Sequence, residues 1–502
     1  MSIMRVRLLA PVFGIWMLIL CSCGSESVIT ILHFADFHDF LQPAVSVVDN
    51  HTNEVGGIAR LIGTVLREKS AAPDSTFVLS AGDAVQGTTF STFFKGEIIY
   101  SLFDKFVDYT VLGVHDLDYS LENLIELTKD RKYQFLAANV LDKEAKPFSG
   151  RDYAIREVNG VKIGFFGLTK LITAILQSEK NIGYLNFAPV EDVAKTMVQT
   201  LRSQGADIII ALTHQGFEED KKLARTVEGI DLIVGGLSHT NLIKGFQTFD
   251  TIIVQAGFRG ENVGKVVIRY DKKKKTVISI TPTIIPVIGS SPADAESARV
   301  VEEYAEDMAT KMGVVIAKTD VHLEGTREVV RRTETNLANM ITDFMCLSSG
   351  AELCLINSGV IRASISEGDI RVADVINTLP YPNSVSVVRI PGRAIYRILE
   401  KSAACLPGEG RFLQVSKGVS YKIRGRVLEE FLFNGREIDF NRYYAVATSD
   451  FLADGGDNYP EFKQDLNPKN TGQTMAECII AVLRQVGSVS PKIEGRIVRL
   501  EE

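Results

Sequence analysis

Residues 29–38 read ITILHFADFH, a run of apolar, β-prone residues that ends in Asp36 and His38. The pattern of an apolar run followed by a polar, ligand-type side chain then recurs through the first half of the chain. In an open α/β sheet, the ends of neighbouring strands converge on one crevice, and ligands bind there. We therefore expect these side chains to meet. The further runs are FVLSAGD at 77–83, TVLGVHD at 110–116, IIIALTH at 208–214 and LIVGGLSH at 232–239.

The side chains that follow these runs are imidazoles and carboxylates, which are the usual ligands of zinc-like and manganese-like ions. A single histidine after a strand is more often a hydrogen-bonded structural residue, and Gly-Asp after a strand is usually a turn. The complete series is much more specific than any one of its members. It indicates a metal-dependent hydrolase.

The order of these motifs resembles that of the calcineurin-like metallophosphoesterases, in particular the 5′-nucleotidase and UDP-sugar hydrolase family. Further matches are GGIAR at 56–60, GDAVQGT at 82–88 and LTHQG at 212–216, and the resemblance extends over nearly the whole mature chain. It implies an α/β fold in which a metallophosphoesterase domain with two layered sheets is joined by a linker helix to a smaller α/β nucleotide-binding domain.

The N-terminus has the features of a secretory signal. Arg5 and Arg7 form a basic region, and residues 8–20 are apolar. This segment is shorter than the roughly 20 residues that span a bilayer, so a cleaved signal fits better. It ends in LCSC at 20–23, which resembles a bacterial lipobox with Cys23 as the lipidated residue, while an ordinary signal peptidase site is the alternative. We expect a lipid-anchored protein of the bacterial cell envelope, periplasmic or surface-facing.

Net charge restricts the partners. The formal net charge of −7 argues against a nucleic-acid polymer, which would require a basic face. Metal ions and a few arginines can still provide local positive charge for a nucleotide phosphate. The one basic run, Lys272 to Lys275, lies between β-prone segments and is predicted to be a solvated hairpin turn.

The cysteines that follow the predicted lipid site contain no CxxC pair, so a zinc knuckle is not expected. Buried thiols and disulfides both remain open, because the predicted compartment is oxidising. These cysteines are Cys346, Cys354, Cys405 and Cys478.

The chain is expected to divide into a signal peptide at 1–23, a metallophosphoesterase-like domain at 28–286, a linker helix at 287–313 and a substrate-binding domain at 314–502. The sequence SPAD at 291–294 offers Ser291 as a helix cap, with proline in the first turn, and Gly313 ends the helix. The resemblance implies that this helix is a hinge, about which the second domain rotates to carry substrate to the metals.

The second half contains the motifs NSGVIR at 357–362, LPY at 379–381, GRFLQVS at 410–416 and DFLADGGD at 450–457. The resemblance implies a nucleoside pocket, in which two aromatic rings stack on a base and polar groups bind ribose, base or phosphate. An upstream arginine of the family does not align here, because Thr333 falls at its place. The residues assigned to the pocket are Asn357, Arg362, Tyr381, Phe451 and Asp457.

The family's metal ligands, carried over by position, divide into a complete set and a damaged set. The complete set is Asp36, His38, Asp83 and His239. The second ion would share Asp83 and take His214, but Val114 and Leu237 replace an asparagine and a histidine. Neither replacement offers a lone pair, so one tight divalent ion (zinc, manganese or similar) and a weak or absent second ion are expected.

The resemblance assigns His115 to charge neutralisation or leaving-group departure, and Asp118 to orienting its ring. Asp116 is interpreted as supporting structure. These retained residues favour a phosphohydrolase of nucleotides or nucleotide sugars, whereas Val114 and Leu237 favour a lipoprotein that binds nucleotides or nucleosides without turnover. A scaffold lipoprotein is the third hypothesis.

Overall fold

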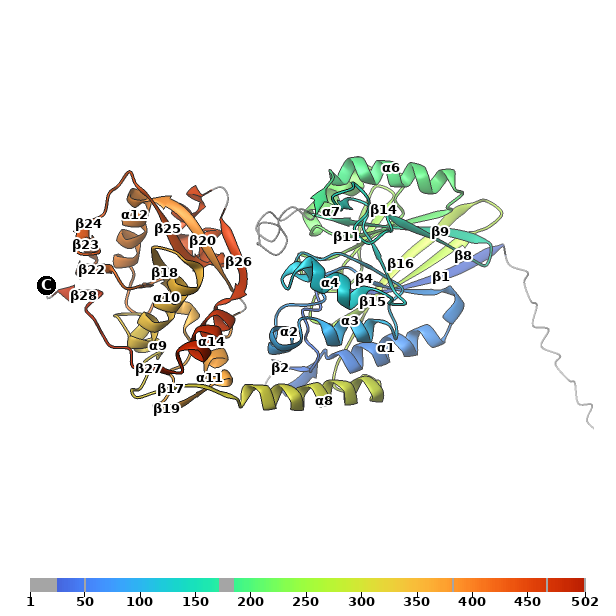
Figure 1. The fold of residues 1–502 in the computed structure, drawn as a ribbon. Coiled ribbons are helices and arrows are strands. Elements are labelled where there is room, and N and C mark those ends of the chain that lie inside the picture. The colour runs from blue at the N-terminus through green and yellow to red at the C-terminus, as the bar shows by residue number, and fades with distance from the viewer. Residues whose placement is uncertain (1–24, 49–50, 171–184, 382, 466–467, 501–502) are drawn as a thin grey trace, which may run out of the picture.

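The structure is a computed structural model that describes residues 25–48, 51–170, 185–381, 383–465 and 468–500. Two lobes, each built from sheets and helices, are joined by the long helix α8 (Ala295–Met312) (Figure 1). This arrangement confirms the predicted α/β class with layered sheets. No helix among the described residues is both long and apolar enough to cross a membrane.

The first lobe is built on two six-stranded sheets. The first has the order β16-β15-β1-β4-β5-β6, and the second has the order β13-β14-β12-β11-β9-β8. The strands of the first sheet are β1 (Glu26–Phe34), β4 (Thr76–Ser80), β5 (Tyr109–Val111), β6 (Gln134–Leu136), β15 (Asn262–Asp271) and β16 (Thr276–Pro286). Those of the second are β8 (Tyr153–Val158), β9 (Val161–Thr169), β11 (Ile208–His214), β12 (Leu232–Gly235), β13 (Phe246–Thr248) and β14 (Thr251–Val254).

The sheets of this lobe pack face to face, and helices cover their outer faces. One buried cluster combines Ile31 and Leu79 of the first sheet with Phe165 and Leu212 of the second, so both inner faces are apolar. The helices are α1 (Ile58–Ser70), α2 (Thr89–Phe94), α3 (Glu97–Phe103), α4 (Leu121–Thr128), α6 (Val190–Ser203) and α7 (Phe217–Thr226). Smaller elements are the pairs β2 (Ala44–Val48) with β3 (His51–Val55) and β7 (Val140–Leu141) with β10 (Asn186–Phe187), and the turns η1 (Pro73–Ser75) and η2 (His115–Leu117).

Parallel pairing brings the polar strand ends together. Strand β1 pairs in parallel with β4, and β4 with β5, in the first sheet, while β11 pairs in parallel with β12 in the second. The carboxyl ends of these five strands therefore lie along one edge of the lobe. The residues that the sequence assigned to the metal site lie at this edge. His214 is the last residue of β11, and the loops after β1, β4 and β12 carry Asp36, His38, Asp83 and His239.

The N-cap of helix α8 lies three residues later than predicted. Asp294, not Ser291, is the N-cap, and its carboxylate accepts the Ser297 backbone N–H at 2.9 Å. The Ser291 hydroxyl instead accepts the backbone N–H of Ile288 at 3.0 Å, which closes a turn before the helix. Val301 is buried against the core of the first lobe.

The second lobe contains a five-stranded sheet flanked by smaller ones. Its order is β21-β18-β25-β20-β26, from β18 (Leu353–Asn357), β20 (Ser384–Pro391), β21 (Leu413–Val415), β25 (Tyr443–Ser449) and β26 (Lys469–Thr474). The smaller sheets contain β17 (Val315–Thr319), β19 (Gly368–Arg371), β27 (Ser488–Val489), β22 (Val419–Arg424), β23 (Val427–Phe433), β24 (Arg436–Glu437) and β28 (Ile497–Leu500).

Helices pack around these sheets. They are α9 (Arg327–Val330), α10 (Asn336–Ser349), α11 (Val372–Thr378), α12 (Gly392–Ala403), α13 (Asp450–Ala453) and α14 (Met475–Val486), with the turns η3 (Ser358–Val360), η4 (Gly456–Asn458) and η5 (Pro460–Gln464). The second lobe contains Cys346, Cys354, Cys405 and Cys478, all as free thiols. Phe93 of α2 packs against a buried cluster of this lobe, so the lobes are in contact.

Candidate active site

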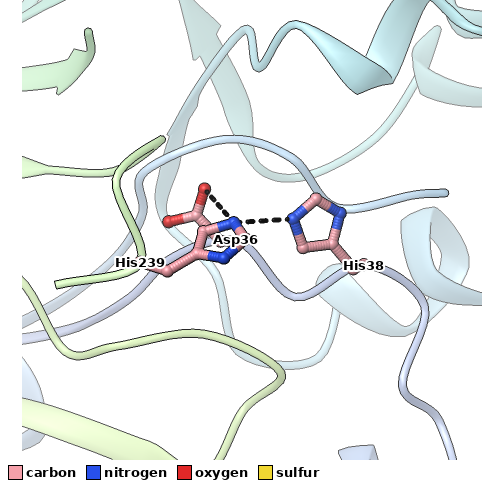
Figure 2. A group of neighbouring side chains, drawn as sticks. All are labelled: Asp36, His38 and His239. Atoms are coloured by element: carbon pink, nitrogen blue, oxygen red, sulfur yellow. Dashed lines mark hydrogen bonds and ion pairs between the residues drawn. The ribbon is translucent and has the colours of Figure 1, made fainter. Parts of the chain in front are cut away.

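The first group of potential metal ligands is Asp36, His38 and His239 (Figure 2). The Nδ1 atom of His38 lies 2.8 Å from the carbonyl oxygen of Gln86. Because a carbonyl oxygen only accepts hydrogen bonds, Nδ1 carries the proton. Nε2 is therefore unprotonated, and its lone pair can coordinate a metal ion. That Nε2 is 3.1 Å from Nε2 of His239, which is 3.7 Å from the Asp36 carboxylate. One ion could be held by all three side chains.

The second group is Asp36, Asp83 and His214, which are all buried. The Nδ1 atom of His214 donates to the carbonyl of Ala81 at 2.7 Å, and its Nε2 lies 3.2 Å from the Asp83 carboxylate. The sequence placed Asp83 in both ligand sets, whereas in the structure Asp36 belongs to both groups. Asp36 thus gives the second group a third potential ligand that the sequence did not predict.

Burial and mutual charge shift the pKa values of these ligands. Burial raises the pKa of Asp36 to about 7 and lowers that of His38 to about 4. Burial also lowers the pKa of His214, but the Asp83 carboxylate outweighs it and the result is about 9. Metal binding requires deprotonated ligands, so a cation at the second group must displace the proton of His214.

The donor set fits a divalent ion such as zinc or manganese, because it consists of carboxylate oxygens and imidazole nitrogens. Val114 is 6% exposed, and its side chain has no atom that could coordinate. Leu237 has a positive φ of 76°, and its backbone N–H donates to the Asp36 carboxylate at 2.9 Å. The Leu237 backbone therefore orients Asp36, although its side chain cannot be a ligand.

His115 lies next to both ligand groups. Its Nδ1 is 2.9 Å from the Asp118 carboxylate, and its backbone N–H donates to Asp83 at 2.8 Å. Its ring centroid is 5.6 Å from that of His38. Burial lowers the pKa of His115, but Asp118 and Asp83 outweigh it and raise the pKa to about 10. The ring therefore offers positive charge beside the potential metal ligands.

Asp116 supports the loops that carry Asp83 and His115. Its carboxylate accepts the N–H of Ala84 at 2.9 Å, the N–H of Gly113 at 2.7 Å and the Tyr100 hydroxyl at 2.9 Å. Gly113 is required for this packing, because an added Cβ would lie 1.9 Å from the backbone nitrogen of Asp83. These contacts agree with the interpretation of Asp116 as supporting structure.

The sequence analysis missed two residues at the edge of the first ligand group. The Phe258 ring stacks on His239 with centroids 4.8 Å apart and planes 7° from parallel. The Arg259 guanidinium lies 4.7 Å from the Phe258 ring centroid and 4.3 Å from that of Phe40. The only signal was the glycine-flanked GFRG at 257–260, which carries no metal ligand.

In the second lobe, the predicted pocket residues form two groups of neighbours, Asn357 with Asp457 and Phe451, and Arg362 with Tyr381. Asn357 donates to the Asp457 carboxylate at 2.7 Å, and the Arg362 guanidinium lies 5.8 Å from the Tyr381 ring centroid. Phe451 lies against the turn before Asp457, since a Cβ on Gly456 would come within 2.6 Å of its ring. The side chains of Tyr381 and Phe451 are 45% and 43% exposed, so both rings are open to a ligand.

Arg331 is a further residue that the sequence analysis left out. It is 8% exposed, its Nη1 donates to the carbonyl of Gly408 at 3.3 Å, and its Nε has no hydrogen-bond partner among the described residues. Burial together with the charges of Arg327 and Arg362 lowers its pKa. A buried, unpaired guanidinium N–H near a second arginine suits an anion. The signal was present, two residues before Thr333.

Comparison with known proteins agrees with this geometry. Residues 29–241 match the calcineurin-like phosphoesterase family, and residues 315–464 match the 5′-nucleotidase C-terminal domain. The chain belongs to the calcineurin-like phosphoesterases that carry a 5′-nucleotidase C-terminal domain. The predicted enzyme class, a phosphoric ester hydrolase of the 5′-nucleotidase type, is confirmed at this level. Proteins of the calcineurin-like family generally bind divalent metals.

Three similar proteins differ in sequence identity and in the share of each chain that is covered. A trifunctional nucleotide phosphoesterase of Bacillus subtilis is 33% identical over 375 residues, which are 70% of this chain but only 25% of that longer protein. The venom 5′-nucleotidase of the snake Crotalus adamanteus is 28% identical over 98% of this chain and 92% of its own length. The crystal structure of a 5′-nucleotidase precursor from Thermus thermophilus superposes with a TM-score of 0.61, at 28% identity, and covers 95% of this chain and 100% of that one.

Proposed function

We propose that this protein is a metal-dependent phosphohydrolase of nucleotides or nucleotide sugars. The observation that carries the proposal is the His115–Asp118 pair. The His115 ring is held at 2.9 Å by the Asp118 carboxylate, and the His115 backbone N–H donates to Asp83 of the second ligand group. A cationic imidazole at this place would neutralise charge on a phosphoryl group.

The metal would be held mainly by Asp36, His38 and His239, with Asp83 and His214 available to a second, weaker ion. A bound divalent ion supplies Lewis acidity and lowers the pKa of its bound water. Around it, the chain's own residues have separate tasks. Leu237 N–H and Asp116 fix the carboxylate-bearing loops, and Asp118 keeps the His115 ring oriented.

The nucleoside would bind in the second lobe. Tyr381 and Phe451 present exposed rings for stacking, and Asn357 and Asp457 form a polar pair. Burial is the main cause that raises the pKa of Asp118, and the charge of Asp450 raises it further. Asp450, which directly precedes Phe451, is therefore close to Asp118. This proximity supports a pocket on the side of the second lobe that approaches His115 and Asp118, as a nucleotide bridging the lobes would require.

The remaining expectations complete the proposal. Residues 1–23 would be a lipoprotein signal with Cys23 lipidated, which would place the protein in the cell envelope. The metallophosphoesterase-like domain would span 28–286, the hinge helix 287–313 and the substrate-binding domain 314–502. Helix α8 at Ala295–Met312 and the matched ranges are compatible with this division.

The test is hydrolysis of AMP and UDP-glucose by the full chain over a titration of Mn²⁺ or Zn²⁺. His115→Gln should lower kcat by about 10²–10⁴-fold and leave the metal content unchanged. His322→Gln, at an exposed histidine of the second lobe, is the matched control and should retain full activity. If both variants hydrolyse AMP at the unmodified rate, His115 has no catalytic role.

A non-catalytic nucleotide-binding lipoprotein is the second candidate, and Val114 with Leu237 is the observation that favours it. The resemblance assigns both apolar replacements to the half-site of Asp83 and His214, whose ligand atoms lie close together. That protein would bind AMP, measured by calorimetry, yet release no phosphate at any metal concentration.

A further inference from the structure

The turn between β15 and β16 consists of four consecutive lysines, Lys272 to Lys275, and all are exposed. None of their ammonium groups forms an ion pair with a carboxylate among the described residues. Asp271 accepts the backbone N–H groups of Lys273 and Lys274 at 2.9 and 3.1 Å, which shapes the turn. The side chains are therefore left free to meet an external anionic group. We call residues 272–275 the lysine turn.

The lysine turn lies where the chain enters the first lobe. The backbone N–H of Lys272 donates to the carbonyl of Ser25 at 2.6 Å, and Glu26 pairs with Asp271 at the start of the β1–β15 ladder. Ser25 is two residues after Cys23. Two residues reach at most about 7 Å, so a lipid on Cys23 would put the bilayer surface beside the lysine turn.

The lysine turn keeps a net positive charge, because Asp271, the carboxylate at its base, is one against four lysines. Glu26, the nearest carboxylate on β1, is held by an ion pair with Arg269, so it does not neutralise the lysines. Val28 and Ile278, on the strands on either side of β15, are 47% and 52% exposed. Basic side chains next to exposed apolar ones are the combination that binds the headgroup region of a membrane.

We propose that the lysine turn docks on anionic lipid headgroups of the bilayer that holds the N-terminal anchor. It is a second, electrostatic contact that goes beyond the proposed hydrolase activity and adds to the proposed lipid anchor. A lipid at one residue is a single point of attachment, about which a protein can tilt. A lipid together with a basic patch gives two contacts with the bilayer, and two contacts restrict the orientation.

This orientation has a consequence for the active site. The lysine turn lies beside the first residue of β1, and Asp36 lies two residues after the last residue of this strand, Phe34. A nine-residue strand is about 30 Å long. Docking through the lysine turn would therefore hold the metal-ligand edge about 30 Å from the bilayer and facing away from it, open to nucleotides in solution. Figure 1 shows the start of β1 at the end of the first lobe that is remote from the second.

The test uses the full chain extracted from cell membranes and inserted into nanodiscs of phosphatidylcholine alone or with 30% phosphatidylglycerol. Lysine acetylation is followed by mass spectrometry. Labelling of the lysine turn should fall at least several-fold in the anionic discs and recover at high salt, while Lys129 and Lys146, exposed on the same lobe, label equally in both. If the chain is recovered soluble instead, the anchor is refuted, and the same labelling with phosphatidylglycerol vesicles tests the turn alone.

Variants sharpen the test. K272S/K273S/K274S/K275S should reduce partition onto anionic vesicles by on the order of 10³-fold, with AMP hydrolysis unchanged, because the turn is remote from the ligand groups. The control K129S/K143S/K146S/K222S removes the same charge elsewhere on the lobe and should bind as the unmodified chain does. Equal labelling in both lipids, equal loss in both quadruple variants, or protection by inorganic phosphate or an oligonucleotide without lipid would overturn the proposal.

Discussion

Introducing ligands at Val114 and Leu237 is the most direct test of the proposed asymmetric metal site. In Val114→Asn with Leu237→His, an amide oxygen and an imidazole would join Asp83 and His214. We expect the content of tightly bound metal to rise from about one ion per chain toward two, because four protein ligands complete a tetrahedral shell. Turnover of AMP or UDP-glucose should rise with it.

The size of the effect on stability follows from burial. Val114 is 6% exposed, so an asparagine amide there lacks water, and leaving it unpaired costs about 1–3 kcal/mol. At a free metal concentration one hundred times Kd, binding contributes about 2.7 kcal/mol. The metal-free double variant should therefore unfold at a lower temperature than the unmodified chain, and metal should recover most of the difference.

The measurements are metal content by mass spectrometry after dialysis in limiting metal, thermal unfolding with and without metal, and phosphate release. Val114→Ala with Leu237→Ala removes the same side chains but adds no ligand, so it should gain neither metal nor activity. Two tight ions in the unmodified chain would refute the reasoning. They would mean that Asp36 already completes the second site, because its carboxylate oxygen lies within 4.8 Å of the ligand atoms of Asp83 and His214.

Three further predictions concern the pocket, the N-terminus and the core. Tyr381→Ala or Phe451→Ala should weaken AMP binding by about 1–3 kcal/mol in calorimetry without changing metal content, and unchanged affinity would make both rings structural. Mass spectrometry of the membrane-extracted protein should find Cys23 as a lipidated first residue, and an unmodified soluble form starting later would exclude the anchor. Burial lowers the pKa of His33 to about 3 from 6.5, so its contribution to stability is present above pH 6.5 and is lost as the pH falls toward 3. When the pH is lowered from 6.5 to 5, the free energy of unfolding of His33→Leu should therefore fall by about 2 kcal/mol less than that of the unmodified chain. Denaturant unfolding at both pH values measures this, and parallel pH profiles of the two proteins would contradict it.

The sequence allowed the fold to be predicted because its periodic signals are local. Each apolar run between residues 29 and 239 that was singled out became a strand or its carboxyl end, and parallel pairing then brought the polar ends to one edge. The lysine turn was equally local, since a basic tetrapeptide between two β-prone segments leaves few alternatives to a hairpin. The position of the turn beside Ser25 could not be predicted, because it depends on the pairing of β1 with β15.

The detailed pairing of ligands could not be predicted, because it depends on loop conformation. Asp36, His38 and Leu237 all have positive φ values of 50°, 53° and 76°, which non-glycine residues seldom adopt. These angles turn the Asp36 carboxylate toward the Leu237 N–H and toward both ligand groups. Arg331 was missed for another reason, since its partner Gly408 lies 77 positions away in the sequence.

The choice between hydrolase and binding protein depends on which retained residues the fold itself needs. Asp116 ties together Ala84, Gly113 and Tyr100, so its loss would disturb the loops whatever the function. The pair of His115 and Asp118 is different, because their side chains bond to each other at 2.9 Å and the loop is held by the His115 backbone instead. A binding protein would keep its loops without that pair. Its presence beside the ligand groups therefore favours phosphoryl chemistry over simple nucleotide binding, even with the proposed weakening of one half-site.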